Sequence, residues 1–251
     1  MQLLLFLLAC IMVPRTETGE IIGGHEAQPH SRPYMAHIKF LKYNEMTCGG
    51  FLIQEDFVLT AAHCYGSSMN VTLGAHDINK QEETQQHISV RRAIPHPDYN
   101  EKTFFSDIML LQLKEKAKLT KVVGILQLPE ENAQIMPGKV CSVAGWGWLS
   151  LGIPTSKLHE VKLTVQKNQE CASCFPSHYK NTSEICVGDP TKKAVSYKGD
   201  SGGPLVCDNV AQGIVSYGNK NGTPPGVFTK ISSFLKWIKK TIKSLQMKKS
   251  D

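Results

Sequence analysis

The chain has 251 residues with a formal net charge of +6, from 28 Lys and Arg against 22 Asp and Glu. Hydrophobic residues make up 41% of the chain, which supplies enough apolar surface for a core and argues against intrinsic disorder. Ordinary contents of 20 Gly and 13 Pro exclude a collagen-like or low-complexity chain. The small charge, with no accompanying motif, argues against a nucleic-acid partner.

The first residues predict a signal peptide. The segment from Leu3 to Val13 is almost continuously apolar, about as long as the hydrophobic part of a signal sequence and too short to span a bilayer comfortably. Thr16 and Thr18 are small enough for a cleavage site. We therefore predict a signal peptide over residues 1–18, a secreted protein and no membrane span. A buried N-terminal helix is disfavoured by Pro14 and the polar residues after it.

The predicted strands follow in chain order. Short segments rich in β-branched or apolar residues recur between Gly, Pro, Asn and Asp, without long helical periods between them. This pattern predicts an all-β fold, a sandwich or barrels. The segments are Tyr34–Phe40, Phe57–Ala61, Val71–Leu73, Ile88–Ile94, Ile108–Leu113, Val140–Ala144, Lys162–Val165, Leu205–Val206 and Ala211–Ser216.

The end of the chain predicts a helix over about 233–246. Apolar residues and one threonine recur there at helical spacing, at Phe234, Trp237, Ile238, Thr241, Ile242 and Leu245. Ser232 or Ser233 is suited to cap its start. We expect the apolar stripe to dock on the body of the protein.

The cysteines predict disulfide bonds. Of the 8 cysteines, Cys10 lies in the predicted signal peptide, and an odd number remains in a secreted chain, so one thiol is left over. The pair Cys171 and Cys174 has the spacing of a redox motif or of half a zinc site. No second pair of this spacing and no βαβ pattern accompanies it, so we expect neither, and no metal or cofactor.

Three segments carry the chemistry. They are Leu59-Thr-Ala-Ala-His63-Cys64, Ser106-Asp107-Ile-Met-Leu-Leu111 and Gly199-Asp200-Ser201-Gly202-Gly203-Pro204, and a fourth, Ile21-Ile22-Gly23-Gly24, follows the signal peptide. In this order they resemble the trypsin/chymotrypsin-like serine protease family along essentially the whole mature chain. The resemblance implies a protease domain over 21–251. Two antiparallel six-stranded β-barrels, at roughly 21–125 and 126–232, would precede the C-terminal α-helix, with the active site between them.

The residue types suit the chemistry that the resemblance implies. A serine hydroxyl is a weak nucleophile and needs an adjacent base. His63 would accept the proton of Ser201, and Asp107 would hold the other ring nitrogen. The chain order His, Asp, Ser is a known order for such a triad. The backbone N–H groups of Gly199 and Ser201 would bind the oxyanion, so the chain is predicted to be a serine endopeptidase that works through an acyl-enzyme.

Other segments resemble the granzyme and mast-cell chymase branch of the family. They are Pro29-His-Ser-Arg-Pro-Tyr-Met35, Val71-Thr-Leu-Gly-Ala-His76, Ile94-Pro-His-Pro-Asp-Tyr99 and Ile185-Cys-Val-Gly-Asp189. In that branch an acidic dipeptide is trimmed in secretory granules, which here would be residues 19–20. The new ammonium group of Ile21 would then pair with Asp200. The resemblance also implies serpin-type inhibitors as partners.

The same resemblance implies the disulfides Cys48–Cys64, Cys141–Cys207 and Cys171–Cys186, with Cys174 unpaired. From the spacing alone, either Cys171 or Cys174 could pair with Cys186.

The resemblance also describes a specificity pocket. Val195, beside Ser196, stands where trypsin-like members have Asp, so a basic P1 side chain would be buried without a counter-ion. Gly226 stands where granzyme B-like proteases have the Arg that selects an acidic P1 residue. We therefore expect a chymase-like preference for Phe, Tyr, Leu or Met at P1.

Further contacts are expected on both sides of the scissile bond. The edge formed by Ser216, Tyr217 and Gly218 would pair with the extended substrate backbone. Lys198 would favour acidic residues on the leaving-group side.

The surface suggests two further features. The lysines of the C-terminal helix, together with Lys192, Lys193 and Lys198, suit a sulfated glycosaminoglycan of a granule proteoglycan, although an ordinary solvated face is an equal alternative. Asn70 and Asn181 begin glycosylation motifs, and we expect both to be used; Asn221 begins a third that also reads as a turn. A competing function is that of an inactive cationic granule protein that acts by binding, but the intact triad argues against it.

Overall fold

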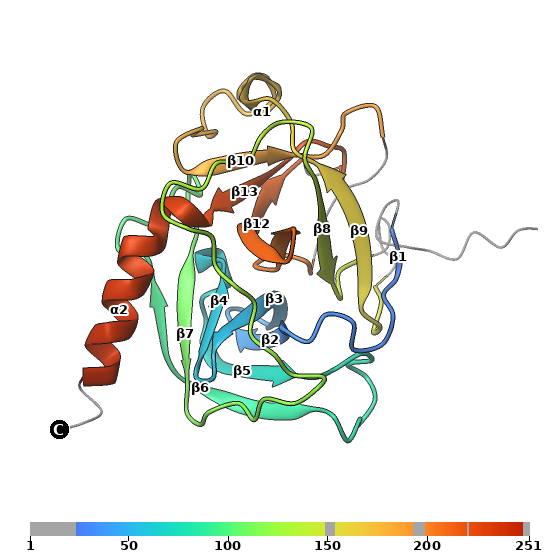
Figure 1. Cartoon of the computed structure of the whole chain (residues 1–251), viewed down its shortest axis with the longest axis vertical. Helices are drawn as coiled ribbons and strands as arrows, with labels where there is room; N and C mark the ends of the chain where they lie inside the picture. Colours follow the sequence, from blue (N-terminus) through green and yellow to red (C-terminus); the bar gives the residue numbers. More distant parts are fainter. Residues whose placement is uncertain (1–23, 149–153, 193–198, 220, 248–251) are drawn as a thin grey trace, which may run out of the picture.

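Two β-structures lie one above the other, and the C-terminal helix lies along one side of them (Figure 1). The structure is a computed structural model that describes residues 24–148, 154–192, 199–219 and 221–247. The expected signal peptide, residues 1–18, and the dipeptide at 19–20 lie outside the described residues. Within the described ranges, no helix is both long and apolar enough to cross a membrane.

The first half of the described chain is a closed antiparallel barrel with the strand order β2-β3-β4-β7-β6-β5. Its core is apolar: Phe51, Phe57, Leu59 and Leu110 are fully buried. This half is the first predicted six-stranded barrel. Its strands are β2 (Met35–Leu41), β3 (Glu45–Gln54), β4 (Phe57–Thr60), β5 (Ser67–Leu73), β6 (Gln86–Pro95) and β7 (Met109–Leu113).

The second β-structure, as far as it is described, is a seven-stranded antiparallel sheet with the order β1-β9-β8-β11-β12-β13-β10. Strands β8 to β13 come from the second half of the chain and match the number expected for a second barrel, and β1, from the start of the described chain, adds to the outer edge of β9. Just past β9, an isolated bridge between Val165 and Val187 joins the chain to β10. The strands are β1 (His25–Glu26), β8 (Val140–Gly145), β9 (His159–Thr164), β10 (Glu184–Val187), β11 (Pro204–Cys207), β12 (Val210–Gly218) and β13 (Gly226–Lys230).

Strands β1, β3, β10 and β13 lie outside the segments predicted from the sequence. In β3 the pair Gly49-Gly50 weakens the strand signal, because glycine is depleted in strands. The other three are only 2 to 5 residues long, too short for a clear alternation. Pairing with neighbouring strands, rather than local preference, makes these segments extended.

The C-terminal helix forms as expected and docks on the body. Helix α2 (Leu235–Met247) buries Leu235, Ile238 and Ile242. It begins two residues later than predicted because Ile231–Phe234 forms a 3₁₀ turn, η2. The rings of Phe234 and Trp237 pack on His96, just after β6, at centroid distances of 5.1 and 5.0 Å. Two further short helices are η1 (Ala62–Cys64) and α1 (Asn168–Cys174).

Candidate active site

His63 and Asp107 are brought together by the neighbouring strands β4 and β7. Thr60, at the end of β4, pairs with Met109, at the start of β7. His63 lies in η1, just after β4, and Asp107 lies just before β7. The Asp107 carboxylate accepts two hydrogen bonds from His63, one from the backbone N–H at 2.9 Å and one from Nδ1 at 2.8 Å. A carboxylate only accepts, so this contact places the imidazole proton on Nδ1 and leaves Nε2 available as a base.

The carboxylate of Asp107 is fully buried and remains ionised. Burial opposes the charge, but the positive charge that His63 carries when protonated and the hydrogen bonds from His63 and Ser216 outweigh it, and together they lower the pKa of Asp107. Ser216 Oγ donates to Oδ2 at 2.5 Å, and Thr229 Oγ1 donates to the Asp107 carbonyl at 2.7 Å. Both donors come from the second half of the chain, so Asp107 lies at the junction of the two halves.

Ser216 reaches Asp107 because β12 is irregular at this residue. Val215 pairs with Phe228 and Tyr217 pairs with Val227, which leaves Ser216 as the extra residue of a bulge. A bulge re-aims the side chain at that position. From the sequence, Ser216 was assigned only to the substrate edge, and its bond to Asp107 was missed. No local sequence signal marks the bulge.

The segment that carries Ser201 docks against η1 and β3. The Ser201 carbonyl accepts a hydrogen bond from Gly49 N–H at 2.8 Å, and it lies 3.9 Å from Cys64 Sγ. Gly202 N–H donates to the Val215 carbonyl at 2.9 Å. The backbone of Ser201 is therefore adjacent to the 3₁₀ turn that carries His63.

Gly199 has a backbone conformation that other residues rarely adopt. Its φ is +97°, in the left-handed region, and an added Cβ would lie 2.7 Å from the Cα of Gly147. The structure thus accounts for glycine at this position of the Gly-Asp-Ser-Gly-Gly motif.

Asp200 is fully buried, and its Oδ1 accepts a hydrogen bond from Gly147 N–H at 3.1 Å. Its expected partner Ile21 lies outside the described residues, as do Val195, Ser196, Lys193 and Lys198. The predicted ion pair and this wall of the specificity pocket stay predictions.

The described part of the expected pocket contains two facing glycines. Gly226, the first residue of β13, pairs with Gly218, the last residue of β12. An added Cβ on Gly226 would have no neighbouring atom closer than 3.7 Å. A small side chain would therefore fit here without a clash, and the open pocket wall stays a prediction.

A buried acid behind Tyr217 was not predicted from the sequence. Tyr217 O–H donates to Glu184 Oε2 at 3.3 Å, and the backbone N–H of Lys180 donates to the same oxygen at 2.6 Å. Burial raises the pKa of Glu184 to about 7. The available signal was a single acid in the otherwise apolar strand Glu184–Val187.

Three disulfides join the same pairs that the family resemblance implies. They are Cys48–Cys64, Cys141–Cys207 and Cys171–Cys186, and Cys174 is free and exposed. Potential ligand atoms of Cys48, His63 and Cys64 lie within 4.8 Å of one another. Because both sulfurs belong to a disulfide, this group offers no thiolate to a metal.

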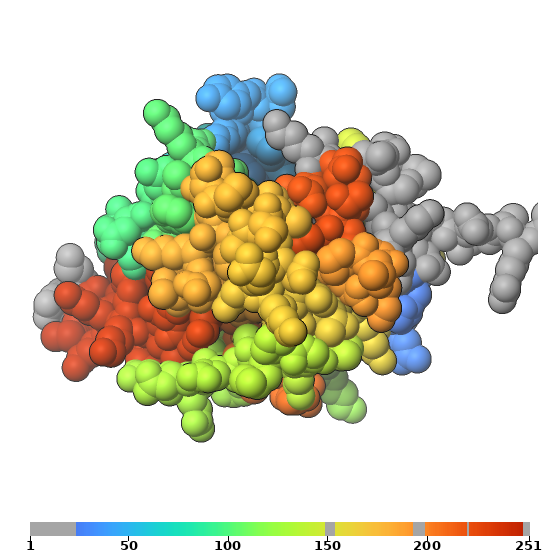
Figure 2. All heavy atoms as spheres, turned by 90° about the horizontal axis from the view of Figure 1, so that it is seen from above, coloured from blue at the N-terminus to red at the C-terminus, as the bar shows by residue number. Residues whose placement is uncertain are grey.

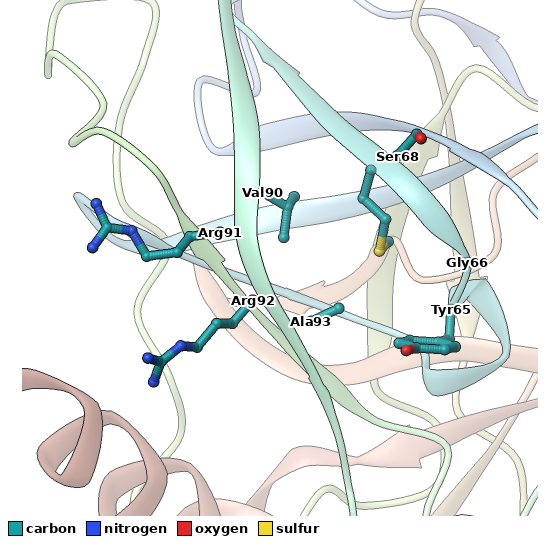
Figure 3. Close-up of a pocket in the computed structure, with 8 residues that line it drawn as sticks. Tyr65, Gly66, Ser68, Val90, Arg91, Arg92 and Ala93 are labelled. Atoms are coloured by element: carbon teal, nitrogen blue, oxygen red, sulfur yellow. The ribbon is translucent and has the colours of Figure 1, made fainter. Parts of the chain in front are cut away.

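A surface groove and the three predicted glycosylation motifs lie on different parts of the described chain. A groove lined by Tyr65, Met69, Arg91 and Arg92, among others, lies between β5 and β6 and contains none of the predicted site residues (Figure 3). Asn70 and Asn181 are both exposed. Asn221 accepts hydrogen bonds from the Thr223 hydroxyl at 2.8 Å and from its backbone N–H at 3.3 Å, which is the turn that the sequence suggested.

Comparison with known proteins gives consistent matches over the whole site. The family model described as Trypsin matches residues 21–238. Granzyme H of Homo sapiens is 60% identical over 246 residues, covering 98% of this chain and 100% of granzyme H. Granzyme B of Homo sapiens is 60% identical over 245 residues, covering 97% of this chain and 99% of granzyme B. A solved structure described as "Structure of GrC" aligns with a TM-score of 0.86 at 58% identity, covering 89% of this chain and 100% of that one.

Proposed function

We propose that this chain, which belongs to the trypsin family and is a chymotrypsin-like serine endopeptidase, cleaves peptide bonds after large apolar residues. The observation that carries the proposal is the contact between His63 and Asp107. A buried, ionised carboxylate fixes the imidazole at 2.8 Å, and the Ser201 backbone is adjacent to the turn that holds it. An imidazole oriented by a carboxylate is the base that a serine hydroxyl needs, which supports the proposed role of His63.

In the proposed mechanism, Ser201 Oγ attacks the carbonyl carbon of the scissile bond. His63 Nε2 takes the hydroxyl proton and then donates it to the leaving amine, which yields an acyl-enzyme that water hydrolyses by the same route. Asp107 stabilises the imidazolium while it exists. The N–H groups of Gly199 and Ser201 bind the negative oxygen of the tetrahedral intermediate, and one such donor contributes about 10²–10³ in rate.

The proposed P1 preference is for Phe, Tyr, Leu or Met. Two observations support it: Gly226 brings no positive charge to the pocket, and a Cβ at this position would make ordinary van der Waals contacts, the nearest at 3.7 Å, without a clash. Val195, at the other wall, is apolar and offers no counter-ion to a basic side chain. Tyr217 and Gly218 would pair with the acyl side of the substrate as an added strand.

The proposed maturation removes residues 1–18 and then the dipeptide 19–20, which frees the ammonium group of Ile21. A buried charge without its partner costs about 3–5 kcal/mol. Pairing of Ile21 with the fully buried Asp200 would therefore couple cleavage to the formation of the oxyanion site. The mature protease domain would comprise 21–251, with the two halves at 21–125 and 126–232.

The proposed location is a secretory or cytolytic granule, since relatives with matching length are named granzymes. A sulfated proteoglycan is a proposed partner there. Lys236, Lys240 and Lys243 on α2 have no ion-pair partner among the described residues, whereas Lys239 is paired with Glu131 at 2.8 Å. Serpin-type inhibitors and glycans on Asn70 and Asn181 complete the proposal.

The test is P1 profiling of protein that begins at Ile21, with a Ser201→Ala variant as the control. We expect cleavage after Phe, Tyr, Leu or Met, and labelling by a fluorophosphonate only when Ser201 is present. Cleavage after Arg, Lys or Asp instead would refute the pocket assignment. If the processed protein shows neither cleavage nor labelling, the alternative of an inactive cationic protein that acts by binding is favoured.

A further inference from the structure

Glu184 is a buried carboxyl group that the proposed mechanism does not use. Its residue is only 5% exposed, on a strand whose other members, Ile185, Cys186 and Val187, are apolar. One oxygen, Oε2, accepts hydrogen bonds from the Lys180 backbone N–H and from the Tyr217 hydroxyl. Burying an ionisable group costs free energy unless its contacts compensate. The contact with Tyr217 connects this carboxyl to the proposed substrate edge.

Tyr217 belongs to a row of aromatic rings that extends to His63. Its ring lies 5.4 Å from that of Phe175, edge to face, and 5.6 Å from that of Phe104. The Phe104 ring lies 5.8 Å from the imidazole of His63. Tyr217 is thus the one member of this row that hydrogen-bonds to the buried acid.

The loop that carries Phe104 is held from both sides. Lys42, in the β2–β3 hairpin, pairs with Glu101 at 2.9 Å, and the Lys180 ammonium lies 5.7 Å from the centre of the Phe105 ring. Seen from above, this loop (green, at the left) lies beside the β2–β3 hairpin (blue) and the segment that follows α1 (Figure 2). The loop therefore has its own contacts on both sides, and the side chain of Tyr217 contacts Phe104, Phe175 and the carboxyl of Glu184.

From this arrangement we infer that Glu184 is a positioning residue for substrate recognition. Its carboxylate holds Tyr217 by the hydroxyl group and so fixes the edge on which the acyl side of an extended substrate binds. The inference rests on the proposed function and deepens it. The ligand of this edge is a peptide substrate that extends from P1 toward its N-terminus. A substrate whose first residue is P1 does not contact the edge.

The contact strengthens when Glu184 is ionised. Hydrogen bonds to a charged acceptor are roughly twice as strong as those between neutral groups. Two charged groups act on the carboxyl of Glu184: Lys180 lowers its pKa and Asp107 raises it. The hydroxyl-bearing rings of Tyr179 and Tyr217 lie beside it, and Lys230 lines the same pocket. Burial outweighs the rest, and the pKa of Glu184 is about 7. The hold on Tyr217 is therefore expected to tighten as the pH rises through neutrality.

The experiment compares an extended substrate with a minimal one. We would measure kcat/KM for a tetrapeptide amide and for a single-residue amide with the same P1 group, from about pH 5.5 to about pH 8.5. Both substrates react through the same catalytic residues, so the ratio of their kcat/KM values removes the pH dependence of the shared chemical step. We expect the ratio to rise about threefold to tenfold with pH, through KM rather than kcat, which corresponds to the extra strength of a charged hydrogen bond.

Matched variants isolate the contact. Glu184→Gln keeps an acceptor of the same shape but does not titrate, and Tyr217→Phe lacks the hydroxyl, so we expect both to give a ratio that does not change with pH. Tyr179→Phe is the control, because that hydroxyl donates to Asn168 Oδ1 at 2.5 Å instead. Hydrolysis of the minimal substrate shows that a variant is folded. A wild-type pH dependence in Glu184→Gln would overturn the inference.

A second measurement does not depend on hydrolysis. In Ser201→Ala protein with carboxyl-labelled Glu, the Glu184 resonance is assigned by its loss in Glu184→Gln. As the pH is varied, we expect the Tyr217 ring resonances to shift with the same midpoint as the Glu184 carboxyl resonance. If they are independent of the Glu184 titration, the inference is wrong even when the enzyme is active. If the wild type cleaves neither substrate but the resonances shift together, the proposed function fails and the positioning contact stands.

Discussion

Removing the Ser216 hydroxyl is expected to weaken the fold in a pH-dependent way. Ser216 Oγ donates to Asp107 Oδ2 at 2.5 Å, and the two residues are 6% and 0% exposed, so little water is available to replace the bond. A hydrogen bond to a charged group contributes about 1.5–3 kcal/mol. We expect Ser216→Ala to lower the free energy of unfolding at about pH 7 by this amount, and to raise the pKa of Asp107 because one stabilising donor is lost.

The sign of the pH dependence follows from the lowered pKa of Asp107 in the folded state. Such a group contributes stability above the pKa of the unfolded chain, about 3.9, and this contribution is lost as the pH falls through the folded pKa. Ser216→Ala brings the folded pKa closer to the unfolded one. The difference between the two proteins is therefore largest at neutral pH and shrinks only as the pH falls through their folded-state pKa values, which lie below that of the unfolded chain.

The assay is urea unfolding in steps from about pH 7 down to about pH 2, past the lowered pKa of Asp107, with disulfides intact, in a Ser201→Ala background that prevents self-digestion. Ser89→Ala is the matched control, since Ser89 Oγ donates to the neutral Asn70 Oδ1 at 2.8 Å on an exposed surface. We expect this control to change the unfolding free energy by less than about 0.5 kcal/mol. An equal effect of Ser216→Ala over the whole pH series would refute the reasoning, because the hydroxyl would then act by packing alone.

Three further substitutions test the site and the fold. Gly199→Ala should lower kcat by about 10²–10³ with little change in KM, because the added Cβ would lie 2.7 Å from the Gly147 Cα and displace an oxyanion donor; an unchanged kcat in steady-state assays would contradict this role. Gly226→Arg should add cleavage after Asp, visible in P1 profiling, and no gain would argue against Gly226 as a pocket wall. Ile238→Ala should lower the unfolding free energy by about 2–5 kcal/mol, because the side chain is 1% exposed under α2, whereas exposed Lys240→Ala should change it by less than about 0.5 kcal/mol in the same urea titration.

Much of the proposed site was predictable because its residues belong to short sequence motifs. Each proposed catalytic residue lies in a short recognisable segment of the sequence. These segments are Leu59–Cys64, the residues around Asp107 and the Gly-Asp-Ser-Gly-Gly motif. The structure brings His63 to Asp107 and the Ser201 backbone to Cys64. The helix at the C-terminus was predictable for a similar reason: its apolar period is local, and only its first turn was placed differently.

The choice between Cys171 and Cys174 shows where local spacing stops being informative. Both lie on α1, three residues apart, and either spacing to Cys186 is acceptable in sequence. In the fold, Cys171 is fully buried against β10 and bonds to Cys186, whereas Cys174 is exposed. The face that a short helix turns to its neighbour is decided by packing.

The sequence by itself determined which residue types are available for the chemistry, most strands of the first barrel and the C-terminal helix, because these depend on short motifs and on local apolar periodicity. Only the tertiary structure decided that Ser216 bonds to Asp107, 109 residues away, and that Glu184 holds Tyr217. The first contact depends on a bulge in the β12–β13 ladder, and the second on a side chain that one sheet turns inward. Each contact joins residues that are far apart in sequence, 109 and 33 positions, so no local window of sequence contains both partners.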